Sequence, residues 1–198
     1  ADTAERMRTA RSALEHATFD VAQIVAEPRE IGSIRVNVAA LERQSKEIQL
    51  RLLAHALRWV SGSDYRPRLT ALKHALTAVF HGKGHSLSGC LISKEKAGVV
   101  EVSREVSAVK VANANSGVFD GRWVCDSAQG EWRTLGVEGL AHFPNWRDTA
   151  EHRNALLASP SLWYNNELKS APLLGNNAIY KCRLRDGPKS FFNSILTH

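Results

Sequence analysis

Residues 41–60, LERQSKEIQLRLLAHALRWV, carry the clearest helical pattern in the chain. Apolar side chains recur there at spacings of four, four and three residues, at Ile48, Leu52, Ala56 and Trp59. This spacing predicts an amphipathic helix over the stretch, with one face buried in a core. Arg51, His55 and Arg58 recur on another face, and they predict a basic strip that is open to solvent.

The segments around this helix predict one small mixed unit. A second helix begins near Pro67, because proline is tolerated in the first turn of a helix. Apolar and β-branched residues indicate strands over residues 34–38, 86–93 and 99–106, and residues 94–98 form the hairpin loop between the last two. Together these elements predict a β-α-α-β-β unit over residues 31–110.

The rest of the chain predicts a connector and a second small domain. Residues 1–30 comprise a connector helix over residues 2–17 and the segment that follows it. Residues 111–117 are small, polar and turn-forming, which indicates a linker. Residues 118–198 predict a smaller β-rich α+β domain. Residues 120–125 are expected to form a turn that enters a strand, residues 132–137 and 178–184 are expected to be further strands, and the expected helix is residues 148–157. The fold class is therefore α+β, with two small domains.

Composition places the chain among ordinary globular proteins. Of its 198 residues, 43% are apolar and 23% are charged, which is typical of a chain that folds around a core. No apolar run approaches the ~18 residues that a membrane span needs. The cysteines, Cys90, Cys125 and Cys182, are few and far apart, and they favour neither a disulfide framework nor a zinc site. We therefore expect a soluble cytoplasmic protein without membrane contact.

The positive charge lies in the middle of the chain. The formal net charge is +6, yet residues 31–110 hold thirteen Lys and Arg against six Asp and Glu. A basic module beside a near-neutral one is typical of a protein in which one module binds phosphates. Charge alone is equally compatible with a basic face that only contacts solvent. The residues predicted to bind a polyanion are Arg51, Arg58, Arg66, Arg68, Lys73, Lys94, Lys96 and Arg104, and their charge fits DNA, RNA or an acidic protein equally.

Candidate catalytic groups are weak in this sequence. The stretch Ser61-Gly62-Ser63-Asp64 follows a helix instead of a strand, which favours a turn between helices over a phosphate-binding loop. Glycines between His81 and His85 argue against a metal pair on a helix. Cys125 with His142 and Asp148 lacks the signs of an activated thiol. We predict no catalytic residue, metal site or cofactor in this chain.

Four short segments, in order, resemble the C-terminal region of bacterial tRNA(Ile)-lysidine synthetase. The first comprises residues 48–59 followed by Tyr65-Arg66-Pro67-Arg68 and Leu72. The second and third are residues 87–92, LSGCLI, and residues 98–105, GVVEVSRE. The fourth is residues 119–123, FDGRW, with Leu135-Gly136, and it looks like the last domain of some members.

The resemblance implies a role in tRNA modification. The family enzyme uses ATP and magnesium to adenylate the wobble cytidine of tRNA(Ile) with a CAU anticodon, and lysine then displaces AMP to form lysidine. That ligase chemistry belongs to an N-terminal ATP pyrophosphatase domain that we expect to be absent here. The chain would then be the tRNA-recognition portion, inactive alone, with tRNA(Ile) and that catalytic domain as partners and a homodimer allowed.

A non-catalytic alternative stays open at this point. The same basic surface would suit a scaffold or regulatory module that binds an acidic protein or nucleic acid in general.

Overall fold

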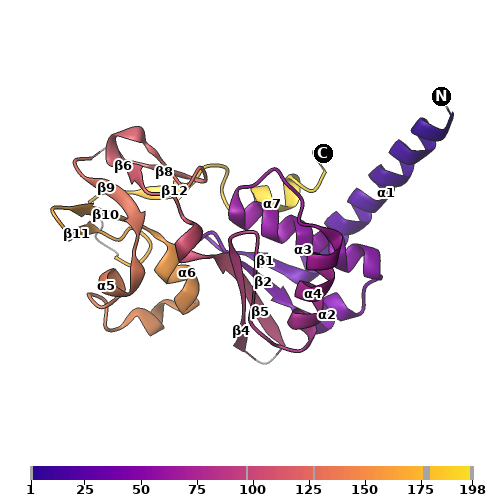
Figure 1. Ribbon diagram of the computed structural model, residues 1–198, viewed down its shortest axis with the longest axis horizontal. Coiled ribbons are helices and arrows are strands. Elements are labelled where there is room, and N and C mark those ends of the chain that lie inside the picture. The colour runs from indigo at the N-terminus through magenta and orange to yellow at the C-terminus, as the bar shows by residue number, and fades with distance from the viewer. Residues whose placement is uncertain (1, 97, 127, 176–178, 197–198) are drawn as a thin grey trace.

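The computed structural model describes residues 2–96, 98–126, 128–175 and 179–196. Within these ranges it combines helices with three antiparallel sheets, so the predicted α+β class is confirmed. Figure 1 shows two lobes side by side, with the N-terminal helix extending away from the first lobe. No helix in the described ranges is long and apolar enough to cross a bilayer.

The first lobe is a five-stranded sheet with helices packed against it. The strand order is β1-β2-β5-β4-β3, and all neighbours are antiparallel. Ile34 pairs with Val102 and Val36 pairs with Val100, and all four side chains are buried in one core with the apolar faces of the helices. The elements are α1 (Asp2–Val25), β1 (Ala26–Pro28), β2 (Ile34–Asn37), α2 (Val38–Glu42), α3 (Lys46–Ser61), α4 (Leu69–Phe80), β3 (His85–Leu87), β4 (Cys90–Lys96) and β5 (Val99–Arg104).

The helix predicted over residues 41–60 is two helices, α2 and α3. Ser45 is the N-cap of α3 and accepts a hydrogen bond from the Ile48 amide at 3.5 Å. The side-chain amide of Gln49 donates to the carbonyls of Leu41, Glu42 and Gln44, so it satisfies the end of α2. The apolar spacing continues through this break and therefore did not reveal it.

The strand predicted over residues 86–93 is also divided. Ser88 and Gly89 have φ values of 54° and 70°, and this turn folds β3 back on β4. The Lys94–Gly98 loop is tighter than predicted, because β4 continues to Lys96 and β5 begins at Val99. Ala97 lies outside the described residues. The lobe is thus a β-α-α-β-β unit extended by two short edge strands.

The first helix is longer than the predicted connector over residues 2–17. It ends at Val25, and its buried side chains are Thr18, Ala22 and Val25. These three positions belong to the last part of the helix, where it packs against α3. Most residues before Thr18 are exposed, whereas Leu14 and Glu15 are half-buried, and the connector role stays a prediction.

The second lobe contains two small sheets around buried aromatic residues. The strand orders are β11-β10-β9-β6 and β12-β8-β7. Trp132 and Phe119 are completely buried in this lobe. The elements are η1 (Val106–Ala108), β6 (Ala112–Asn113), η2 (Ala114–Ser116), β7 (Val118–Phe119), β8 (Trp123–Cys125), β9 (Glu131–Thr134), α5 (Gly136–Leu140), η3 (Trp146–Thr149), α6 (Arg153–Ala158), β10 (Pro160–Tyr164), β11 (Glu167–Ser170) and β12 (Cys182–Leu184).

Several expected elements of this lobe are corrected by the structure. The helix predicted over residues 148–157 is broken at Ala150, whose φ is 57°, so a 3-10 turn precedes α6. Strands β10 and β11 were not predicted. The strand expected over residues 178–184 is the shorter β12, and residue 178 lies outside the described residues.

Two of the three cysteines form a disulfide, which corrects the prediction of unpaired cysteines. Cys125 on β8 and Cys182 on β12 are register partners across an antiparallel pair, and they are bonded. Fifty-seven positions separate them in sequence, so only the strand pairing brings them together. Cys90 is a buried thiol, and burial raises its pKa to about 12.

The end of the chain returns to the first lobe. Helix α7 (Ser190–Asn193) follows the second lobe, but Phe191 and Ile195 belong to the core of the first lobe. The Phe191 ring lies 5.0 Å from His55 and 5.9 Å from Trp59 between ring centroids. The predicted division into residues 31–110, 111–117 and 118–198 stays a prediction, and this contact was not foreseen.

An ionic cluster lies between the sheet of the first lobe and the second lobe. Arg35 on β2 contacts Glu95 at 2.8 Å and Glu101 at 3.4 Å, and it donates to the carbonyl of Ala150. The carboxylate of Glu101 is completely buried. Burial raises the pKa of Glu101 to about 7, although the charge of Arg35 opposes this rise.

The raised pKa of Glu101 predicts a pH-dependent loss of stability. Because the folded pKa lies above the unfolded value, Glu101 lowers the free energy of unfolding as pH rises from about 4.5 through about 7. Glu101→Gln removes this titration. The free energy of unfolding of the variant, relative to that of the wild type, should therefore be about 2–3 kcal/mol higher at pH 8 than at pH 5. Denaturant unfolding at the two pH values measures this difference. Glu131→Gln at an exposed position is the control, and an equal difference at both pH values for Glu101→Gln would contradict the prediction.

Candidate nucleic-acid interface

Two hollows lie beside α3 and share two side chains in their walls. His55 and Arg58, from the predicted basic strip of this helix, line both of them. The His55 ring is held by the C-terminal segment, because its Nε2 lies 2.7 Å from the carbonyl oxygen of Phe191. The shared walls make the hollows neighbours on one face of the molecule.

The first, which we call the arginine hollow, has a volume of about 360 Å³. Its walls come from α1, α3, the loop after α3 and the C-terminal segment. They consist of Arg11, Glu15, Thr18, Arg51, Ala54, His55, Arg58, Arg66 and Ile195. The walls thus contain four arginines and one glutamate, so positive charge predominates in the hollow.

Ion pairs orient two of these arginines. The Nε of Arg11 contacts Glu15 at 2.7 Å, and the Nε of Arg51 contacts Glu47 at 2.6 Å, both four residues apart on a helix. A guanidinium carries five N–H donors, so an arginine that gives Nε–H to a carboxylate keeps its terminal N–H groups for an anion. The pairs therefore position the arginines without using up their donors.

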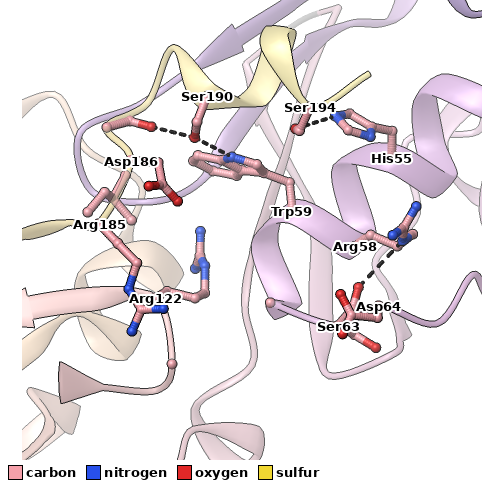
Figure 2. A pocket seen from close by; sticks show the side chains of 14 residues that line it. His55, Arg58, Trp59, Ser63, Asp64, Arg122, Arg185, Asp186, Ser190 and Ser194 are labelled. Carbon is pink, nitrogen blue, oxygen red and sulfur yellow. Dashed lines mark hydrogen bonds between the residues drawn. The ribbon is translucent and has the colours of Figure 1, made fainter. Parts of the chain in front are cut away.

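The second, which we call the junction hollow, has a volume of about 380 Å³ and lies where the two lobes meet. Figure 2 shows Trp59 near its centre, with Arg185 and Asp186 on one side and Ser63 and Asp64 on the other. It is lined by His55, Arg58, Trp59, Gly62, Ser63, Asp64, Gly121, Arg122, Leu184, Arg185, Asp186, Gly187, Ser190 and Ser194.

Helix α7 fixes the indole of Trp59 in this hollow. The indole Nε1–H donates to the Ser190 hydroxyl at 3.0 Å, and that hydroxyl donates to the carbonyl of Gly187 at 2.6 Å. On the other side, the Nε–H of Arg58 donates to the Ser63 carbonyl at 3.4 Å. The bond between Trp59 and Ser190 thus joins segments 131 positions apart, and the other two bonds fix the local turns of the walls.

The buried guanidinium of Arg122 forms the base of the junction hollow. It donates to the Gly32 carbonyl at 2.9 Å and lies 4.9 Å from the centre of the Trp59 ring. Burial lowers its pKa to about 10, and the nearby Asp120 opposes this, so the group stays charged at neutral pH. Gly32 has a φ of 79°, and a Cβ there would come within 2.9 Å of Trp123.

The structure brings three predicted RNA-binding residues together and separates the others. Arg51, Arg58 and Arg66 line the arginine hollow. Arg68 is the N-cap residue of α4 and Lys73 lies on that helix, both exposed. Lys94 is exposed on β4; Lys96 is on the same strand, and its side chain lies outside the described part. Arg11 was not predicted, because α1 was interpreted only as a connector.

The side chain of Arg104 is engaged by other groups of the protein. Its Nε contacts Asp120 at 2.8 Å, and its terminal nitrogens donate to the carbonyls of Gly89 at 2.7 Å and Ala108 at 2.6 Å. Like Arg122, it links the two lobes. One signal in the sequence could have separated Arg104 from the others. It follows Val100 and Val102 at a spacing of two, and in a strand this spacing places all three side chains on the same face.

The candidate phosphate loop and the candidate thiol of the sequence have structural roles. The stretch from Ser61 to Asp64 ends α3, with Gly62 as a left-handed C-cap, in agreement with the turn prediction. The disulfide to Cys182 occupies the Cys125 thiol. Among the described residues, no group of three or more His, Cys, Asp or Glu side chains is arranged to hold a metal ion.

Comparison with curated proteins identifies two similar sequences. The tRNA(Ile)-lysidine synthase of Ruegeria pomeroyi (strain ATCC 700808 / DSM 15171 / DSS-3) is 35% identical over 202 residues, covering all of this chain and 48% of the relative. The tRNA(Ile)-lysidine synthase of Anaplasma marginale (strain St. Maries) is 28% identical over 111 residues, covering 54% of this chain and 24% of the relative. The chain resembles tRNA(Ile)-lysidine synthase.

This similarity confirms the resemblance inferred from the ordered segments. The chain spans about half the length of the Ruegeria lysidine synthase and less of the Anaplasma one. No family model and no solved structure matches the chain significantly.

The geometry around Arg122 predicts a large stability effect. Arg122→Ala removes the hydrogen bond to Gly32 and the contact with Trp59, and it leaves a buried carbonyl without its donor. We expect the free energy of unfolding to fall by about 2–4 kcal/mol. The matched control, Arg153→Ala at an exposed position, should change it by less than about 0.5 kcal/mol. Equal losses in the two variants, measured by denaturant unfolding, would contradict the role of Arg122.

Proposed function

We propose that this chain is the tRNA-recognition portion of a tRNA(Ile)-lysidine synthase, and that its arginine hollow holds phosphates of the tRNA. The observation that carries the proposal is the convergence of Arg11, Arg51, Arg58 and Arg66 on one hollow. Similarity to tRNA(Ile)-lysidine synthases over the whole chain supports tRNA as the polyanion. The ligase reaction, with ATP and magnesium, is proposed for the full-length enzyme and assigned to no residue of this chain.

Counterion release explains why this arrangement suits RNA. Each arginine that neutralises a phosphate releases condensed cations, so affinity falls steeply with salt concentration. The planar guanidinium forms two parallel hydrogen bonds to phosphate oxygens, which a lysine ammonium cannot do. The four arginines come from α1, α3 and the loop after α3. An RNA backbone bound in the hollow would therefore run along α3.

The remaining predicted basic residues have different places in the proposal. We keep Arg68 at the N-cap of α4, Lys73 on that helix and Lys94 on β4 as outlying phosphate contacts, and Lys96 stays a prediction from the sequence. Arg104 is left out, because its guanidinium is engaged by Asp120 and by two carbonyls.

Removal of Arg66 should weaken tRNA binding without unfolding the chain. Arg66 is exposed and lines the arginine hollow, so Arg66→Ala should lower affinity for a tRNA(Ile) transcript with a CAU anticodon about 3–10-fold. The slope of log affinity against log salt should also fall by about one. Fluorescence anisotropy at several salt concentrations measures both quantities.

The matched control is Arg43→Ala, an exposed arginine between α2 and α3 that lines neither hollow. It should leave the affinity within about twofold of wild type. Equal effects of the two substitutions would remove the arginine hollow from the proposal. No salt-dependent tRNA binding by the wild-type chain would remove tRNA recognition altogether.

A further inference from the structure

The two hollows beside α3 differ in charge, although they share His55 and Arg58. The arginine hollow has four arginines and one glutamate in its walls. The junction hollow has three arginines, but it also has Asp64 and Asp186, and Arg122 is turned toward Trp59 and Gly32. A phosphate suits the first hollow, whereas a neutral group with hydrogen-bond donors suits the second.

The two carboxylates of the junction hollow are open acceptors. Asp64 follows the end of α3 and Asp186 lies between β12 and α7, and both side chains are exposed. No ion pair or hydrogen bond to another residue of the described part engages either carboxylate. Figure 2 shows them on opposite sides of Trp59, so the hollow offers an acceptor on each side of the indole.

Both aspartates are held by ordered turns. The amide of Ser63 donates to the Arg58 carbonyl at 3.2 Å, and the amide of Tyr65 donates to the Ser63 hydroxyl at 3.2 Å. On the other side, the amide of Gly187 donates to the Leu184 carbonyl at 3.2 Å, which closes the turn that carries Asp186. The acceptors are therefore presented by fixed backbone.

The component of an RNA chain that offers neutral O–H donors is the ribose. Carboxylates that accept ribose hydroxyls are a common feature of nucleotide sites. The hollow, at about 380 Å³, is within the range of sites for small molecules, and the indole supplies an apolar surface for a sugar or base. A backbone bound in the neighbouring arginine hollow would thus place one nucleoside beside Trp59.

We propose that the junction hollow takes one nucleoside of the bound RNA, and that the pair Asp64 and Asp186 supplies the carboxylate that accepts its 2′-hydroxyl, the one ribose hydroxyl that stays free within an RNA strand. The chain then distinguishes RNA from DNA at this nucleoside, because DNA lacks the 2′-hydroxyl. This inference rests on the proposed function, since the arginine hollow has to bring the RNA backbone to α3.

The test compares tRNA with a DNA of the same sequence. The wild-type chain should bind the tRNA at least about tenfold more tightly than the DNA, and Asp64→Ala combined with Asp186→Ala should reduce this ratio about tenfold. The double variant should raise affinity for DNA, because it removes two negative charges. Both positions are exposed, so we expect the fold to persist, which unfolding curves check.

Glu15→Gln is the matched control, because Glu15 is an acidic residue of the arginine hollow. It should raise the affinity for both polyanions and leave their ratio unchanged. If the double variant behaves in the same way, or if the wild-type chain binds RNA and DNA equally, the ribose inference is overturned while phosphate binding stands. If the wild-type chain binds neither polyanion, the proposed function and the inference are both overturned.

Discussion

The guanidinium of Arg122 lies between the indole of Trp59 and the carbonyl of Gly32, and through it the second lobe is fixed to the first. A buried cation has a high desolvation cost unless its donors are satisfied, so this arrangement tolerates little variation in geometry. Gly32 can approach so closely because it has no Cβ and a φ of 79°. Since Arg122 also forms the base of the junction hollow, the geometry of that hollow depends on this contact.

The C-terminal segment is the second part of the structure that holds the hollows in place. Phe191 is buried in the core of the first lobe, and its neighbour Ser190 accepts the indole N–H of Trp59. The segment therefore contributes walls to both hollows, with Ser190 and Ser194 in one and Ile195 in the other. The proposed RNA surface is thus assembled from the first helix, the central helix and the last helix. Along α3 its lining changes from four arginines and one glutamate to three arginines and two aspartates.

Much of the first lobe could be predicted from the sequence because its signals are local. The apolar positions Ile48, Leu52 and Ala56 are buried as their spacing predicts, and the strip with Arg51 and Arg58 lines the basic hollow. The break before α3 was missed because it depends on the Ser45 cap and the Gln49 side chain, which leave the apolar spacing intact. The disulfide, Arg11 and Asp186 were missed because long-range packing alone gives them their roles.

The central claim is that RNA lies along α3 and contacts both hollows. Photocross-linking of the chain to a tRNA(Ile) transcript containing 4-thiouridine, followed by peptide mapping, tests it most directly. The account predicts cross-links in α1 near Arg11, in residues 51–66 and in residues 184–195, three of the segments that line the hollows. Cross-links confined to α4 and β4, around Lys73 and Lys94, would contradict it.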